Sequence, residues 1–445
     1  VITSKHHDGF ALFDSKVTDW DAVDASGAGR DLIDPLAKAS RKAGLKFGLY
    51  YSQAQDWTHP GGAKARYKEG ESWDEANKGD FDTYLRTIAA PQVEEILTRY
   101  KPDVLWWDTP TWMTTERAAR LIPYVGRVPG IIHNNRLGGG FKGDTTTPEQ
   151  HIPATGLPGD WEVCMTMNKT WGYKSYDHNW KSVEDITHKL CDIVSKGGNF
   201  LLNVGPTAEG EIPQESIDRL EAVGRWLDVN GEAIYGTTAS PFHKLPWGRA
   251  TKKVRENGAT IYLHVFDWPG DGKLLVPGLR NDIRSASLLA GGKPIVTVQG
   301  DEGVTLQLPK SAPDAIASII RLEVEGKLNV ESVTLKQKAD GSVLLDAAHV
   351  EINNPGYGDH AKIEHKGGKS NIGYWLDKRS WVKWTFVVKQ PGTFTVSTEV
   401  ASAADSALQW GLAGKLERES IASTGSYESF STVTLGQVTI DKAGT

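Results

Sequence analysis

Cysteine is scarce in this sequence. Only Cys164 and Cys191 occur among 445 residues, and their spacing matches no metal-binding or redox motif. The two residues are able to pair, but we expect free thiols rather than a disulfide. Neither lies in a basic setting, and no Gly-x-Ser-x-Gly motif is present, so thiol and serine nucleophiles receive little support.

Long apolar segments and an excess of basic residues are also missing. No run approaches the roughly 18 apolar residues that a membrane-spanning helix needs, so we expect no membrane insertion. The Lys and Arg residues number 50 against 56 Asp and Glu, which gives a net charge of −6. This balance argues against nucleic acid or an anionic membrane as a partner.

Strand patterns are cut off at both ends of the sequence. Residues 1–5 read as a strand already under way, and residues 438–445 stop where a strand pair should continue. We therefore expect both termini of a longer protein to be missing, and the lack of a visible signal peptide carries little weight.

Strands and helices alternate over the first 230 or so residues. The pattern predicts helices at 31–43, 81–100 and 214–230, and strands at 45–51, 103–107, 131–135 and 199–204. Repeated β-then-α units predict a parallel sheet with right-handed crossovers. Periodicity does not separate an open sheet from a closed barrel, but polar residues at the ends of successive strands favour a (β/α)8-like TIM barrel whose N-terminal strands are missing.

The helical pattern ends at about residue 233. Short alternating strands such as 260–265, separated by Pro-Gly and Gly-Gly turns, predict an antiparallel β-sandwich. A second β-rich module begins at about residue 327, where 381–388 and 391–396 are predicted as two strands joined by a turn. We therefore expect three domains: a catalytic barrel at 1–232, a β-sandwich at 233–326 and an incomplete second β-sandwich at 327–445.

An apolar strand ends in a carboxylate at Asp108, directly after Trp106 and Trp107. Sugar-cleaving barrels place a nucleophilic acid at such a strand end, and indoles offer flat faces to a pyranose ring. The alternative is a buried strand followed by an Asp108 that caps the next helix. The 16 tryptophans of the chain fit large core side chains as well as carbohydrate stacking.

A second carboxylate follows about one βα unit later. Glu149 lies 41 residues (149 − 108) beyond Asp108, so the two groups are able to meet across the barrel mouth. A retaining glycosidase needs two such acids about 5 Å apart, one ionised and one protonated. Glu149 is alternatively a surface loop acid, and Glu162 is the runner-up for the acid/base or a buried structural carboxylate.

Two adjacent histidines, His6 and His7, stand at the end of the first strand pattern. Neighbours on a strand point to opposite faces, so they share a metal ion only if the backbone turns there. A metal site needs further ligands, for which His133 is the obvious candidate. We expect instead that both rings bind substrate hydroxyls, with no metal, and structural histidines are the remaining alternative.

Several motifs together resemble the α-L-fucosidases of glycoside hydrolase family 29. In the family's order, they are Lys5–Phe10, Gly48–Ser52, Leu105–Asp108, Trp161–Thr166 with Trp171–Tyr173, and Leu201–Pro206. The resemblance implies a retaining exo-glycosidase that removes terminal α-L-fucose from an oligosaccharide or polysaccharide by double displacement, without metal or cofactor. It also implies an extracellular or periplasmic location.

The resemblance also assigns roles to individual residues. Asp108 corresponds to the nucleophile and Glu149 to the acid/base of some members, with Glu162 as the alternative. The remaining predicted substrate-binding residues are His6, His7, Tyr50, Trp106, Arg136 and Trp161. The tail from 327 resembles a carbohydrate-binding β-sandwich through residues 381–384 and 391–392.

Two departures from the family pattern stand out. Trp107 and Thr109 flank Asp108, whereas the family usually has Phe and Gly there. The family's His-Trp-Gly and Glu-Trp-Tyr motifs precede the Lys-His-His block and do not occur in this sequence. A fucose-binding protein without turnover therefore remains the alternative function, and a metal-dependent barrel hydrolase is a third.

Overall fold

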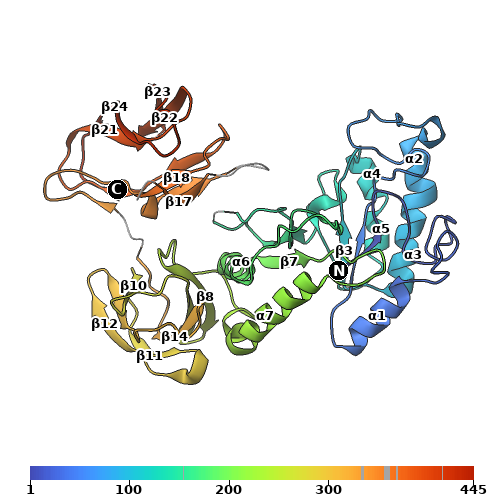
Figure 1. Ribbon diagram of the computed structural model, residues 1–445, viewed down its shortest axis with the longest axis horizontal. Helices are drawn as coiled ribbons and strands as arrows, with labels where there is room; N and C mark the ends of the chain where they lie inside the picture. Colours follow the sequence, from blue (N-terminus) through green and yellow to red (C-terminus); the bar gives the residue numbers. More distant parts are fainter. Residues whose placement is uncertain (154, 332–334, 355–360, 367–368, 413, 445) are drawn as a thin grey trace. The chain divides into compact units, whose positions relative to one another are not determined.

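The computed structural model describes residues 1–153, 155–331, 335–354, 361–366, 369–412 and 414–444 (Figure 1). These residues form two compact units. The first contains 1–150, 157–165 and 198–201, and the second contains 151–156, 166–197 and 202–445. The domain boundaries after residues 232 and 326 stay a prediction.

Strands alternate with helices in the first half of the chain, as predicted. The strands are β1 (Ile2–Lys5), β2 (Gly48–Tyr51), β3 (Val104–Trp107), β4 (Ile132–His133), β5 (Thr145–Thr146), β6 (Asp160–Thr166) and β7 (Asn199–Asn203). The α-helices are α1 (Ile33–Lys42), α2 (Phe81–Tyr84), α3 (Ala90–Tyr100), α4 (Thr115–Ala119), α5 (Ile122–Val125), α6 (Val183–Ser195) and α7 (Gln214–Asn230). In the described part of the chain, no helix has both the length and the apolar character needed to cross a bilayer.

The strands follow one another in chain order with parallel pairing. One sheet has the order β1-β2-β3-β4, and every neighbouring pair in it is parallel. A parallel bridge between Asn134 and Thr145 leads on to a second sheet of order β5-β6-β7. Because neighbouring strands of the β1-β2-β3-β4 sheet are parallel, their carboxyl ends all lie at one edge of the sheet. A (β/α) barrel builds its active site at this edge.

Helices α1 and α3 lie alongside the sheet and close its core (Figure 1). Their apolar faces meet those of β2 and β3, so that Ile33, Val93, Leu49 and Leu105 are fully buried. The predicted helix 81–100 is one helical rod, but it contains a π-helical turn at Leu85–Ala89 between α2 and α3. The α-helical spacing of the sequence does not reveal such a turn.

Antiparallel strands fold into a sandwich beyond α7, as predicted. The strands are β8 (Gly248–Arg255), β9 (Gly258–Val265), β10 (Lys273–Pro277), β11 (Ile283–Leu288), β12 (Val296–Gly300), β13 (Gly303–Gln307) and β14 (Ser318–Glu325). One sheet has the order β11-β14-β9-β8 and the other β10-β13-β12. Aliphatic side chains of both sheets, including Ile261, Leu306 and Ile320, share one buried core.

The C-terminal part is also built of strands. They are β15 (Leu335–Lys336), β16 (Glu351–Asn353), β17 (Lys362–Lys366), β18 (Lys369–Gly373), β19 (Trp381–Lys383), β20 (Phe386–Val387), β21 (Gly392–Val400), β22 (Ser406–Leu412), β23 (Lys415–Ile421) and β24 (Ser431–Ile440). The prediction of one strand at 381–388 is wrong. The segment is broken because β19 pairs with β16 whereas β20 pairs with β15. The predicted pair 381–388 and 391–396 is not a hairpin either, since β21 pairs with β24.

Candidate active site

Polar and aromatic side chains from the ends of β1, β2 and β3 form the site. In the sheet register Tyr50 of β2 lies opposite Trp106 of β3, and their rings are stacked with centroids 5.6 Å apart. His6 follows β1, and its ring also stacks on Tyr50, with centroids 5.4 Å apart. Three adjacent strands thus present a continuous row of rings beside Asp108, which follows β3.

Asp108 is held as an ionised carboxylate by two donors. The Tyr50 hydroxyl donates to Oδ2 at 2.7 Å, and Arg136 Nη1 donates to Oδ1 at 2.8 Å. Burial by itself would raise the pKa of Asp108, but these hydrogen bonds and the charge of Arg136 hold it below its usual value. The backbone N–H of Asp108 donates to Gln53 Oε1 at 3.1 Å, which fixes the turn after β3.

The two tryptophans before Asp108 face opposite sides of the sheet. Trp106 lies on the side of the site, where the Arg136 guanidinium sits 4.6 Å from its ring centroid. Trp107 is completely buried in the core between the sheet and the helices. Only one of the two indoles is therefore placed to meet a sugar, because successive strand residues alternate in direction.

Thr109 occupies the position where the family usually has glycine. Its φ of 43° lies in the left-handed region, which a β-branched residue rarely adopts. Its hydroxyl lies 3.4 Å from His7 Nε2. The backbone turn that follows the carboxylate is therefore locally strained in this chain.

Arg136 joins Asp108 to the second predicted acid. Its Nη1 donates to Asp108 Oδ1 and to Glu149 Oε2, each at 2.8 Å. The guanidinium is itself fixed by Thr147, whose hydroxyl and carbonyl oxygens accept from Nε at 2.9 Å and from Nη2 at 3.0 Å. Two contacts to one nitrogen place the carboxylate oxygens of Asp108 and Glu149 no more than twice 2.8 Å apart.

Glu162, the runner-up, lies on β6 next to the same row of rings. Its Oε1 accepts a hydrogen bond from Trp106 Nε1 at 3.0 Å. Burial raises the pKa of Glu162 above its usual value. Glu162 therefore belongs to the site, but Trp106 rather than Arg136 is its hydrogen-bonding partner.

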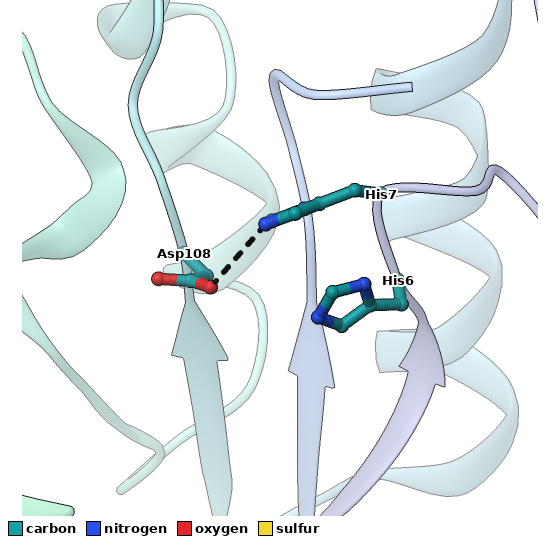
Figure 2. Close-up of side chains that lie close together, drawn as sticks. All are labelled: His6, His7 and Asp108. Carbon is teal, nitrogen blue, oxygen red and sulfur yellow. Dashed lines mark ion pairs between the residues drawn. The ribbon is translucent and has the colours of Figure 1, made fainter. Parts of the chain in front are cut away.

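The backbone turns directly after β1 and brings both histidines to Asp108 (Figure 2). The His6 and His7 rings lie 4.1 Å apart, and His7 Nε2 is 3.8 Å from Asp108 Oδ2. Burial and the neighbouring His6 lower the pKa of His7 to about 4, so its ring is neutral near pH 7. Neutral rings are able to donate and accept hydrogen bonds with sugar hydroxyls.

One ligand atom from each of His6, His7 and Asp108 lies within 4.8 Å of the others, a spacing that also suits a metal ion. Asp108, however, already accepts hydrogen bonds from Tyr50 and from the cationic Arg136. A cation here would share its one carboxylate with a guanidinium, which disfavours it electrostatically. The donor set thus fits a polyhydroxylated ligand better than a metal.

The sequence interpretation overlooked a buried ion pair behind the histidines. Lys5 and Asp56 are both completely buried and approach to 3.1 Å. Asp56 Oδ2 also lies 2.9 Å from His59 Nδ1, and its Oδ1 accepts from the backbone N–H groups of Thr58 and His59. The only sequence signal was that Lys5 precedes the two histidines and Asp56 precedes Trp57. Because 51 residues separate Lys5 from Asp56, the sequence alone does not reveal that they pair.

Trp161 is not brought to this constellation. Its indole is completely buried and packs so closely on Gly198 that a Cβ there would lie 2.5 Å from the ring. Trp161 alternates on β6 with Glu162, which contacts Trp106, so its indole lies on the other face of the strand, and a contact of Trp161 with substrate stays a prediction. Cys164 and Cys191 are free and buried, and burial raises the pKa of the Cys164 thiol to about 12, so it is not an activated nucleophile.

Comparison with known proteins agrees with this geometry. A sequence model of the family described as Alpha-L-fucosidase matches residues 1–232. The plasma alpha-L-fucosidase of Rattus norvegicus is 33% identical over 338 residues, covering 70% of this chain and 69% of that protein. The crystal structure of alpha-L-fucosidase from Vibrio sp. strain EJY3 is 26% identical with a TM-score of 0.71, and the match covers 99% of this chain and 78% of that one.

A further similar structure is a GH29 alpha-L-fucosidase from Bacteroides thetaiotaomicron. It was trapped as a covalent intermediate with 2-fluoro-fucosyl fluoride in a Glu-to-Gln mutant. It is 26% identical with a TM-score of 0.64, and the match covers 73% of this chain and 78% of that one. Such neighbours combine a catalytic (β/α)8 domain with a β-sandwich. The similarity favours an enzyme over a sugar-binding protein without turnover. The chain belongs to the α-L-fucosidase family of glycoside hydrolases.

Proposed function

We propose that Asp108 is the nucleophile and Glu149 the acid/base of this α-L-fucosidase, which releases terminal α-L-fucose from fucosylated glycans. The observation that carries the assignment is the guanidinium of Arg136, which touches both carboxylates at 2.8 Å. The two oxygens that contact Arg136, Asp108 Oδ1 and Glu149 Oε2, therefore lie no more than twice 2.8 Å apart, and this close approach supports a retaining pair, whose carboxyl groups are ~5–5.5 Å apart. Inverting enzymes need a wider gap of about 6.5–9.5 Å to admit a water molecule between acid and base.

The first half-reaction transfers fucose to the enzyme. Asp108 attacks the anomeric carbon, the glycosidic C–O bond breaks, and Glu149 donates its proton to the departing oxygen. The products of this step are a glycosyl ester on Asp108 and the free hydroxyl of the leaving glycan. Because Asp108 is ionised through its contacts with Tyr50 and Arg136, no base is needed to activate it.

The second half-reaction releases the sugar. Glu149, now a carboxylate, takes a proton from water, and the water oxygen attacks the anomeric carbon while the ester bond to Asp108 breaks. Two inversions at one carbon give net retention, so the first product is the α-anomer of L-fucose. The trapped covalent intermediate of the Bacteroides thetaiotaomicron relative supports this double displacement.

The surrounding rings bind and orient the fucosyl group in this proposal. His6 and His7 supply neutral ring nitrogens, while Tyr50 and Trp106 form a stacked wall next to Asp108. Hydrogen-bonding groups held in place by packing lower the entropic cost of reaching the reactive geometry.

Glu162 is the second candidate for the acid/base, because burial raises its pKa and favours the protonated form that an acid needs. Two variants, Glu149→Ala and Glu162→Ala, separate the candidates. Loss of the acid should cut hydrolysis of a natural fucoside by about 10²–10⁴-fold but spare a 2,4-dinitrophenyl fucoside, whose leaving group needs no proton. Added azide should then rescue only the variant that lacks the acid/base.

The activity itself is tested with p-nitrophenyl α-L-fucopyranoside and proton NMR. Initial release of the α-anomer supports double displacement, whereas initial release of the β-anomer refutes the assignment of Asp108 as nucleophile. No release from any α-L-fucoside overturns the assigned roles as a set.

We also propose the finer organisation that the sequence predicts. It consists of an eight-stranded barrel, a β-sandwich to about residue 326 and a carbohydrate-binding module beyond it. The match with the Vibrio enzyme over 99% of the chain supports an architecture of this extent. Export from the cytoplasm is proposed as well, supported by similarity to a plasma enzyme.

A further inference from the structure

We propose that an exposed aromatic platform, formed by Trp57, Trp73 and Tyr67, binds the sugar to which the fucose is attached. The inference rests on the proposed function and identifies the leaving-group side of the same site. The platform lies in the loop between β2 and α2, for which the family-matching motifs imply no substrate contact.

Ring contacts connect the platform to the catalytic carboxylate. His7 Nε2 lies 3.8 Å from Asp108, and the His7 ring meets the edge of Trp57 with centroids 6.0 Å apart. Trp57 then meets Trp73 at 6.4 Å, and Trp73 meets Tyr67 at 6.1 Å. The rings of His7, Trp57, Trp73 and Tyr67 therefore form an unbroken aromatic path. It begins beside Asp108, the proposed nucleophile, and leads away from that carboxylate.

The platform is far more exposed than the His7 ring from which the path starts. The His7 side chain is only 14% exposed, whereas Trp57 is 42%, Trp73 is 53% and Tyr67 is 39% exposed. Clusters of exposed aromatic residues are uncommon on protein surfaces without a binding role. An exo-glycosidase encloses the terminal sugar and must leave the rest of the glycan outside. The aromatic path runs from the active site to the surface, and so it leads to the place where the second sugar of the glycan is expected.

The platform is tied rigidly to the active site. The Trp57 backbone N–H donates to the His7 carbonyl at 2.7 Å, and the Thr58 hydroxyl donates to the Asp8 carbonyl at 2.8 Å. Asp56, next to Trp57, is completely buried against Lys5. A binding group whose backbone is already fixed loses less entropy when a ligand arrives.

A buried lysine supports the outer half of the platform. Lys64 Nζ lies 5.7 Å from the Trp73 ring centroid and donates to the carbonyls of Asp56 and Gly62 at 2.7 and 2.8 Å. These hydrogen bonds therefore fix the ammonium group of Lys64 near the Trp73 ring, where it makes a cation–π contact. The outer indole is fixed from below while half of its surface remains exposed to solvent.

A sugar is the ligand that suits this surface best. A pyranose ring has an apolar C–H face that stacks on indole, and its hydroxyls remain free to bind water. Charges of both signs surround the platform, since Arg66 and Lys68 flank Tyr67 while Glu71 and Asp74 lie close to Trp73 in the sequence. We therefore assign it to a neutral hexose or hexosamine at the reducing side of fucose.

The decisive experiment compares two substrates in Trp73→Ala. α-L-Fucosyl fluoride has no sugar as leaving group, so it reports the pocket alone. A fucosylated oligosaccharide, chosen as the best substrate from a panel of α1,2, α1,3, α1,4 and α1,6 linkages, reports the pocket and the platform. We expect kcat/KM for the oligosaccharide to fall about five- to tenfold relative to kcat/KM for the fluoride, from the loss of one aromatic contact.

Trp20→Ala is the matched control. Trp20 is 41% exposed, like Trp57, but its ring packs on Phe10 at 5.2 Å and is not part of the path. It should leave the ratio of the two kcat/KM values unchanged. Trp57→Phe, which keeps a ring against His7, should give a smaller selective loss than Trp73→Ala combined with Tyr67→Ala.

Each remaining outcome is informative. An unchanged ratio in Trp73→Ala and in the double variant would overturn the platform, as would a wild type that cleaves the fluoride but no oligosaccharide of the panel. A wild type that does not cleave the fluoride would instead refute the proposed function. Circular dichroism melting curves verify that each variant is folded.

Discussion

The catalytic end of the parallel sheet and the interior of the β-sandwich are built in opposite ways. Behind the histidines the chain completely buries Lys5 and Asp56, and Lys64 nearby is 1% exposed. In residues 248–325 no lysine, arginine or carboxylate side chain is buried, and the core is aliphatic. Both regions are well packed, but burying charged groups costs desolvation energy at the catalytic end of the sheet, whereas the sandwich interior has no such cost.

The difference shows what the buried ion pair does. Replacing a buried ion pair with apolar side chains often leaves stability unchanged or higher, so Lys5 and Asp56 are a weak device for stability alone. They do, however, hold the loop that carries Trp57 against the turn that carries His7. Residues 248–325 of the sandwich position no such catalytic turn, and aliphatic packing alone stabilises their core.

The largest expected effect separates chemistry from stability. Asp108→Ala should lower kcat for p-nitrophenyl fucoside by about 10⁴-fold or more, because the nucleophile is lost. Its melting temperature should change by only a few degrees, since the side chain follows the end of β3 and does not belong to the hydrophobic core. Steady-state kinetics and a thermal melt test both statements, and a residual rate within 100-fold of wild type contradicts the first.

Breaking the ion pair should destabilise the catalytic unit strongly. Lys5→Met leaves the Asp56 carboxylate buried without its cation and should cost about 3–5 kcal/mol of unfolding free energy. Lys16→Met, at an exposed pair with Asp14, should cost far less, because solvent and salt screen that pair. Urea unfolding of both variants measures the difference, and equal costs would show that the buried pair is dispensable.

The matching change in the sandwich is Leu306→Ala. Leu306 is completely buried between the two sheets, so its truncation leaves a cavity and should cost about 2–5 kcal/mol. Hydrolysis of fucosyl fluoride should be unaffected at a temperature where the variant is folded. A parallel loss of kcat would contradict the separation between the two regions.

A buried histidine makes the sandwich sensitive to acid. Burial lowers the pKa of His264 to about 3, against about 6.5 in an unfolded chain. The unfolded state therefore binds a proton first as the pH falls below 6.5, and stability is lost progressively towards pH 3. Between pH 7 and pH 5 the wild type should lose about 2 kcal/mol more than His264→Gln, as measured by urea unfolding at each pH. Equal losses would indicate that the ring is not the group responsible.

The smallest effect concerns the strained turn after the nucleophile. Thr109→Gly removes a side chain from a left-handed backbone conformation and should stabilise the catalytic unit by about 1 kcal/mol. It also removes a hydroxyl near His7, so KM should rise slightly. Thr111→Gly nearby is the control, because Thr111 has no positive φ and should lose stability instead.

The sequence predicted those parts of the molecule that depend on local pattern. Strand ends such as Asp108 and helices such as 214–230 were found because each is encoded in a contiguous stretch. The (β/α) barrel was predicted from polar residues at the ends of successive strand patterns, and the structure adds parallel pairing from β1 to β4. The π-helical turn within 81–100 was missed, since one inserted residue barely changes the apolar spacing.

Contacts between distant loops were not predictable in the same way. Lys5 meets Asp56, and Trp57 meets Trp73, through a loop between β2 and α2 that has no periodicity. Trp161 was assigned to the substrate because a Trp-Glu motif does not reveal which of its two residues faces the site. Strand alternation decides that question, but only when the register of β6 is known.

The single guanidinium of Arg136 has a consequence for charge balance over the reaction cycle. If Asp108 and Glu149 act as proposed, the resting enzyme carries one negative charge on Asp108 and a proton on Glu149. In the glycosyl-enzyme Asp108 is a neutral ester, and the negative charge has moved to Glu149. Arg136 contacts both oxygens at 2.8 Å, so it neutralises whichever carboxylate is charged without having to move. One fixed cation thus serves two successive anions, and the site avoids the reorganisation that a separate partner for each would require.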